Sequence, residues 1–147
     1  MFRFLLTCLL LLPAAVTQAE VIDIESAEAA KLSAMGIPVI DVRTAPEWED
    51  SGVVPGSHLL TFFDEQGKAD PATWLAKAKG FSRPADPVIV ICRSGKRSKA
   101  ASQFLSQEAG YAKVYNVKHG IIGWIRENHP TTPAAPVLAS CRKAKTC

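Results

Sequence analysis

The sequence lacks several features that would assign it to a common class of protein. It has no internal repeat and no Cys-x-x-Cys pair, and its 3 histidines and 4 cysteines do not follow the spacing of a zinc site. A repeat protein is therefore excluded, and neither a thioredoxin-like redox site, a metal nor any other cofactor is predicted. The net charge is also small, because the sequence has 17 Lys and Arg residues and 14 Asp and Glu residues. No nucleic-acid partner follows from so mild a balance.

The chain has little continuous apolar sequence, and its one long run lies at the N-terminus. Arg3 precedes an apolar stretch over residues 4–16, and small residues follow at Thr17 and Ala19. A membrane anchor is the less favoured interpretation, because a helix needs roughly 20 apolar residues to cross a bilayer. The pattern is typical of a signal peptide over residues 1–19. We expect export, to the periplasm of a Gram-negative bacterium or otherwise by secretion, and no membrane contact after cleavage.

Cleavage would discard Cys8 and leave an odd number of cysteines, which are Cys92, Cys141 and Cys147. Disulfides persist in exported proteins. We therefore expect a short-loop disulfide between Cys141 and Cys147, which leaves Cys92 free. In the alternative, a cysteine of the C-terminal tail reaches Cys92 and reacts there.

Short apolar runs alternate with helix-like stretches along the mature chain. Strands are predicted at 38–42, 57–61, 88–91 and 113–117. Helices are predicted at 26–34, 44–52, 71–79, 98–107 and 120–128. The run over 88–91 is apolar and β-branched throughout, which is typical of a strand buried on both faces. This alternation predicts one α/β domain over 20–130, with a mostly parallel central sheet flanked by helices. Prolines and basic residues predict a flexible tail over 131–147.

Cys92 directly follows the most buried strand candidate. Ligands of open α/β sheets bind beyond the carboxyl ends of the strands, so this position is a candidate active site. The connection to the next helix consists of Arg93, Ser94, Gly95, Lys96 and Arg97. Its cations, its backbone N–H groups and the positive end of the helix would favour the thiolate over the thiol and could hold an anion. An inert buried cysteine is common, but it would not explain three neighbouring cations.

The segment from Cys92 to Ser98 resembles the Cys-Arg-x-Gly-x-Arg-Ser/Thr active-site loop of rhodanese-like sulfurtransferases. Residues 39–56 and 114–124 resemble the first and the closing signature of the same family. The resemblance implies a rhodanese-like fold and a reaction through a persulfide. In that reaction the Cys92 thiolate takes a sulfane sulfur from thiosulfate or a similar donor and passes it to a thiophilic acceptor.

The resemblance also implies roles for individual residues. Cys92 would be the catalytic nucleophile, and the loop from Arg93 to Arg97 would bind a small sulfur anion. The acceptor could be cyanide, a small thiol or a protein thiol. Val53 and His119 depart from the family pattern, which usually has His and Gly at these positions.

Three further residues are candidates for a supporting role. Asp41 and Arg43 end a predicted strand and would face the same crevice. Asp41 could orient an arginine of the loop, or the two residues could form an ordinary ion pair. Ser98 ends the motif and is the third candidate.

Two other functions would use the same cysteine. Cysteine phosphatases and arsenate reductases need a Cys-x5-Arg loop to enclose a tetrahedral oxyanion, whereas Cys92 and Arg97 give Cys-x4-Arg. The smaller ring favours sulfur transfer. A non-catalytic sulfur or thiol carrier remains an alternative, and turnover with thiosulfate and cyanide would separate it from an enzyme.

Overall fold

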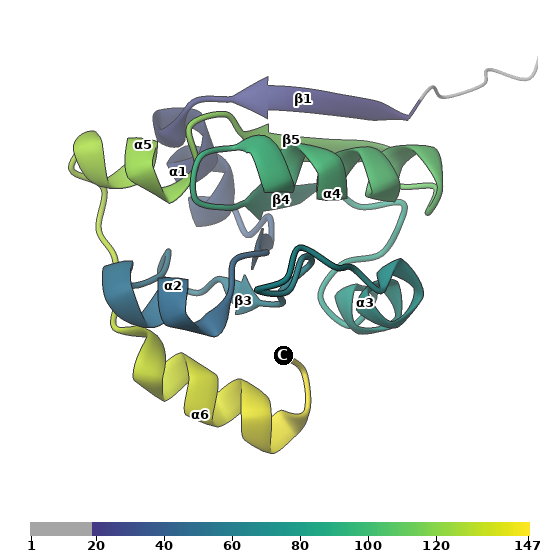
Figure 1. Ribbon diagram of the computed structural model, residues 1–147. Helices are drawn as coiled ribbons and strands as arrows, with labels where there is room; N and C mark the ends of the chain where they lie inside the picture. Colours follow the sequence, from purple (N-terminus) through teal and green to yellow (C-terminus); the bar gives the residue numbers. More distant parts are fainter. Residues whose placement is uncertain (1–18) are drawn as a thin grey trace, which may run out of the picture.

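A parallel sheet of five strands, in the order β1-β5-β4-β2-β3, forms the centre of the protein (Figure 1). The computed structural model describes residues 19–147. The predicted signal peptide, apart from its last residue Ala19, therefore lies outside the described residues, and so does Cys8. The strands are β1 (Glu20–Ile24), β2 (Val39–Asp41), β3 (His58–Leu59), β4 (Val88–Ile91) and β5 (Lys113–Val117). All of their pairings are parallel, which confirms the expected α/β class.

Helices cover both faces of the sheet (Figure 1). They are α1 (Ser26–Ala34), α2 (Ala45–Ser51), α3 (Pro71–Ala78), α4 (Lys96–Gln107), α5 (Gly120–Arg126) and α6 (Ala134–Ala144). Successive residues of a strand point to opposite faces. Val88 and Val90 accordingly pack with side chains of α3 and α4, whereas Ile89 and Ile91 pack with side chains of α1 and α5. The central strand β4 is thus buried on both sides.

The first strand, β1, was not predicted from the sequence. It lies at the edge of the sheet and pairs with β5 over its whole length, from Glu20 opposite Lys113 to Ile24 opposite Val117. Its sequence alternates only weakly, so the pairing with β5 decides its conformation. The strands and helices that were predicted fall within two residues of their predicted bounds, and β3 is shorter than predicted.

The prediction of a flexible tail is wrong for residues 134–144, which form helix α6. Figure 1 shows α6 alongside α2, beyond the β3 edge of the sheet. Its Ala134 and Leu138, one turn apart, pack against Trp48, Val53 and Leu59. Prolines misled the prediction, because they are tolerated in the first turn of a helix, where the backbone N–H groups have no partner within the helix. Within residues 19–147, no helix has the length and apolar character to span a bilayer.

The chain end is tied back to the domain. Cys141 and Cys147 form a disulfide, as predicted, and the thiol of Cys92 is free and buried. The side-chain nitrogen of Lys77 in α3 donates a hydrogen bond of 2.8 Å to the backbone oxygen of Cys147. The basic side chains of the tail are exposed.

Candidate active site

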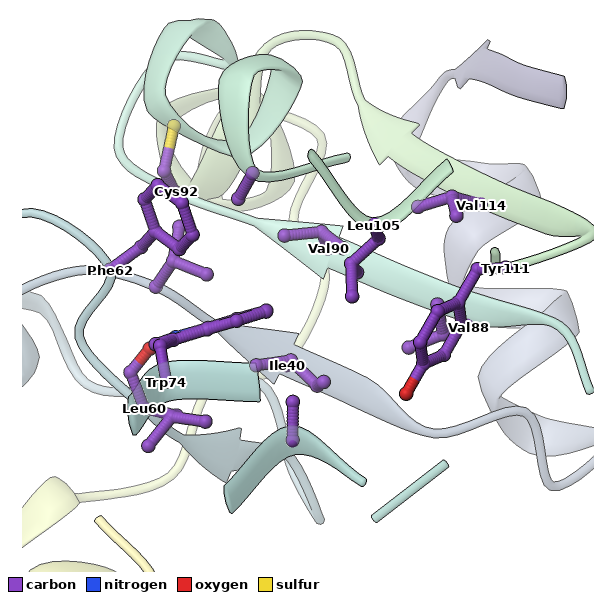
Figure 2. Close-up of a cluster of buried hydrophobic side chains, with 13 residues drawn as sticks. Ile40, Leu60, Phe62, Trp74, Val88, Val90, Cys92, Leu105, Tyr111 and Val114 are labelled. Carbon is purple, nitrogen blue, oxygen red and sulfur yellow. The ribbon is translucent and has the colours of Figure 1, made fainter. Parts of the chain in front are cut away.

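Cys92 lies at the carboxyl end of β4, where the central strand leaves the apolar core. Figure 2 shows its side chain beside Phe62, with the sulfur pointing away from Trp74 and Leu60. The residue is only 1% exposed. A buried strand on one side and the start of α4 on the other thus hold a single sulfur atom at the edge of the sheet.

The loop after Cys92 curls around this sulfur. The backbone N–H of Gly95 donates to the Cys92 Sγ at 3.1 Å. Gly95 has a left-handed backbone with φ of +94°, and a Cβ atom there would collide with the backbone of Lys118. Glycine has no Cβ atom, so it adopts the left-handed backbone without strain and lets the Lys118 backbone approach closely. The N-terminus of α5 braces the loop from below, because the Ile121 N–H donates to the Cys92 carbonyl oxygen at 2.8 Å.

The loop side chains differ in exposure. Arg93, Ser94 and Lys96 are exposed, whereas Arg97 is partly buried. Arg97 forms two hydrogen bonds with the carboxylate of Glu47 in α2, one of them 2.8 Å from Nη1 to Oε2. The bond from Arg97 lowers the pKa of Glu47 to about 2 and raises the pKa of Arg97 above its usual range. The exposed cations Arg93 and Lys96 are accessible to an anion from solvent, whereas the orientation of Arg97 is set by Glu47.

Glu47 was not singled out from the sequence, although one signal for it was present. The spacing of Thr44 and Glu47 is that of a capping box, and the two residues form one at the start of α2, in which the Thr44 backbone N–H donates to Glu47 Oε2 at 3.1 Å. The same carboxylate therefore caps a helix and holds Arg97. The loop arginine is oriented by Glu47 and not by Asp41.

Asp41 and Arg43 form an ion pair with each other, which was one of the two roles considered for them from the sequence. Both side chains are buried, and Arg43 Nη2 lies 2.7 Å from Asp41 Oδ2. The remaining donors of Arg43 reach the carbonyl oxygens of Glu47 and Gly52 and the hydroxyl of Ser51. A buried charge pair is tolerated when its other donors are satisfied in this way. The pair joins the end of β2 to both ends of α2, and so supports the helix that carries Glu47.

Ser98 contacts the sulfur through its hydroxyl group. Its Oγ is 3.3 Å from Cys92 Sγ and 2.6 Å from Asn116 Oδ1. Asn116 on β5 was missed in the sequence. The signal was a polar residue within an apolar strand, and only 3% of it is exposed.

The two departures from the family pattern have local explanations. Val53 is fully buried in the cluster that receives α6, and its backbone pairs with Thr132. His119 is the residue before α5, about half exposed, with Nε2 3.6 Å from Glu25. Neither side chain is among the partners of the Cys92 sulfur.

A hollow of about 170 Å³ adjoins the loop. Glu47, Asp50 and Arg93 form its charged wall, and isoleucines of α5 form its apolar wall. A reactant approaching the loop from this side would meet both kinds of surface.

Comparison with known proteins agrees with this geometry. Residues 23–127 match the model of the rhodanese-like domain. The chain is 32% identical over 117 residues to thiosulfate sulfurtransferase 18 of Arabidopsis thaliana, covering 76% of this chain and 83% of that protein. It is 31% identical over 110 residues to a sulfurtransferase of Allochromatium vinosum, with 74% and 91% covered.

Solved structures show the same architecture. A rhodanese-related protein from Thermoplasma volcanium superposes with a TM-score of 0.58 at 28% identity, covering 76% of this chain and 97% of that one. A protein from M. tuberculosis superposes with a TM-score of 0.63 at 23% identity, covering 76% and 96%.

Proposed function

This chain belongs to the rhodanese-like domain family, and from that premise we propose that it is a sulfurtransferase that carries sulfur as a persulfide on Cys92. The observation that carries the proposal is the sulfur atom of Cys92 at the end of β4, with the Gly95 N–H directed at it at 3.1 Å. The surrounding Cys-x4-Arg loop supplies the cations that a sulfur anion requires.

The proposed reaction has two displacement steps. The Cys92 thiolate attacks the outer sulfur of thiosulfate, the S–S bond of the donor breaks, and its electron pair leaves with sulfite. A nucleophilic acceptor, cyanide or a thiolate, then attacks the outer sulfur of the persulfide and releases the Cys92 thiolate. The covalent intermediate divides one difficult transfer into two easier ones.

The loop residues have separate parts in this proposal. Arg93 and Lys96 are exposed and attract the anionic donor. Backbone N–H groups such as that of Gly95 donate hydrogen bonds to the negatively charged sulfur. Arg97, oriented by Glu47, stabilises the departing sulfite. The hollow beside Arg93 offers room for a small thiol acceptor or for the thiol of a protein partner.

The test is a mass spectrum of the protein after incubation with thiosulfate, together with an assay for released sulfite. The wild-type chain should gain one sulfur atom, and Cys92→Ser, nearly isosteric in a buried position, should gain none while remaining folded. Arg97→Ala should keep the thiol but slow sulfur capture by about 10²- to 10³-fold, which is the usual effect of removing one donor to a developing anion.

Arg83→Ala is the matched control, because Arg83 is an exposed arginine paired with Asp86 and lies outside the loop. It should transfer sulfur at the wild-type rate. Persulfide formation without turnover to cyanide or thiols would identify a carrier. Cys92-dependent hydrolysis of phosphate esters faster than sulfur transfer would refute the ring-size argument.

A further inference from the structure

A row of hydrogen bonds runs from the Cys92 sulfur through the protein to its surface. Ser98 Oγ lies 3.3 Å from the sulfur and 2.6 Å from Asn116 Oδ1. Asn116 Nδ2 donates to Asp23 Oδ1 at 2.8 Å, and Asp23 accepts bonds of 3.0 Å from the Lys99 nitrogen. Ser98 and Asn116 are buried, and Asp23 is partly exposed. Four polar side chains from β1, β5 and α4 thus connect the sulfur to solvent.

The sheet register fixes the direction of the Asn116 amide. Asp23 in β1 is the direct partner of Asn116 in β5. The Asn116 and Lys99 hydrogen bonds lower the pKa of Asp23, so its carboxylate is ionised at neutral pH and can only accept hydrogen bonds. A reversed amide would set oxygen against oxygen. The amide nitrogen therefore faces Asp23, and the amide oxygen faces Ser98.

The Ser98 hydroxyl has one proton for two acceptors. The 2.6 Å separation favours donation to Asn116, and this leaves a lone pair of Ser98 to accept the S–H of a Cys92 thiol. A thiolate or persulfide anion cannot donate in this way. To stabilise the anion, the Ser98 proton would have to rotate away from Asn116.

We propose that Asn116 is a positioning residue that competes with the Cys92 sulfur for the Ser98 proton, and so sets the balance between thiol and thiolate. Its effect on sulfur transfer rests on the proposed function, whereas its effect on the ionisation of Cys92 does not. The carboxylate of Asp23 acts behind it by fixing the amide.

Other charged groups lie on the loop and on the segments next to it, and they must remain constant in a test. The loop cations, the ion pairs behind them and the turn after β5 contribute Arg93, Lys96, Arg97 with Glu47, Arg43 with Asp41, and Lys118 and His119 with Glu25. Replacing Asn116 by an apolar residue of similar size alters none of them, but it removes the hydrogen bond to Asp23 as well as the one from Ser98. The part of an ionisation change that passes through the Ser98 proton is therefore measured by comparing backgrounds with and without Ser98.

The measurement is the thiolate ultraviolet absorbance of the full chain against pH, with the spectrum of Cys92→Ser subtracted. Asn116→Leu should lower the pH midpoint by about 0.7, a roughly fivefold gain in thiolate below the midpoint, as expected for one neutral hydrogen bond released from competition. In a Ser98→Ala background the same substitution should produce no shift. This double-mutant cycle isolates the part of the effect that passes through Ser98.

A midpoint that is unchanged or raised in Asn116→Leu would overturn the proposal, and so would an equal downward shift in the Ser98→Ala background. If Asn116→Leu does not fold, Asp23→Ala decides the question. That residue is 44% exposed, and the change removes both oxygens that can accept from Asn116 Nδ2 together with one negative charge. The downward shift should therefore be larger with Ser98 present than in the Ser98→Ala background, and equal shifts in the two backgrounds are contrary evidence.

Ser102→Ala is the control, because Ser102 is a buried serine of the same helix whose hydroxyl has no partner within the described residues. It should leave the midpoint unchanged. The absorbance titration needs no thiosulfate, so a protein that fails to form a persulfide would refute the proposed function without deciding the role of Asn116.

Discussion

Replacing Glu47 by Gln removes the charge that orients Arg97 while keeping the size of the side chain. The wild-type carboxylate receives two hydrogen bonds from Arg97, and it also accepts hydrogen bonds from the backbone N–H and the hydroxyl of Thr44. An amide can accept through only one of its atoms, so the fork-to-fork contact with the guanidinium is lost. We therefore expect both a less stable fold and a less well oriented Arg97.

The magnitude follows from the ionisation of Glu47. Its pKa falls from 4.5 to about 2, chiefly through the hydrogen bond from Arg97. At about 1.4 kcal/mol for each tenfold change, this corresponds to an upper limit of about 3 to 4 kcal/mol. Solvent screens the pair, because 26% of the Glu47 side chain and 30% of the Arg97 side chain are exposed. We therefore expect about 1 to 2 kcal/mol at neutral pH.

The sign of the pH dependence can be worked out from the same values. A carboxylate whose pKa is lowered by folding stabilises the protein fully above its unfolded pKa, here 4.5, and loses that contribution as the pH falls through about 2. The free-energy difference of unfolding between wild type and Glu47→Gln should be constant above about pH 5 and should shrink below it.

Urea denaturation at several pH values measures this difference. Glu49→Gln, on the same helix but exposed, is the control and should have little effect at any pH. A difference between wild type and Glu47→Gln that stays constant from neutral to acid pH would refute the reasoning. Sulfur capture by Glu47→Gln should lie between that of wild type and that of Arg97→Ala.

Two further predictions concern the ends of the chain. Cys141→Ser should lower the free energy of unfolding by about 2 kcal/mol, as expected for opening a short disulfide loop, while Leu138 and Ala134 keep α6 packed; an unfolding curve of the wild type that is insensitive to reductant would be contrary evidence. We also propose export with cleavage after Ala19, so N-terminal sequencing of the secreted chain should begin at Glu20, and a membrane-bound chain that starts at Met1 would contradict this.

The sequence by itself determined the α/β class and the position of the candidate nucleophile. Both depend on neighbouring residues: the apolar, β-branched run of β4, and the glycine and cations that directly follow Cys92. Local patterns of this kind predict a buried strand and an anion-binding loop without knowledge of the rest of the chain. The pairing of Cys141 with Cys147 was also accessible, since the two cysteines lie only six residues apart.

Only the tertiary structure decided which side chains support Cys92. Glu47 meets Arg97 across 50 residues of sequence, and Asn116 meets Asp23 across 93. Such contacts depend on strand order and register, which bring Val90 of β4 beside Asn116 of β5 and Asn116 beside Asp23 of β1. The composition of residues 134–144 also led to a wrong prediction. Their helix buries two apolar side chains, Ala134 and Leu138, and it is stable only where Trp48, Val53 and Leu59 form the surface against which these pack. Long-range packing, which no local pattern encodes, therefore determines both the hydrogen-bond partners of the site and the fate of the C-terminal segment.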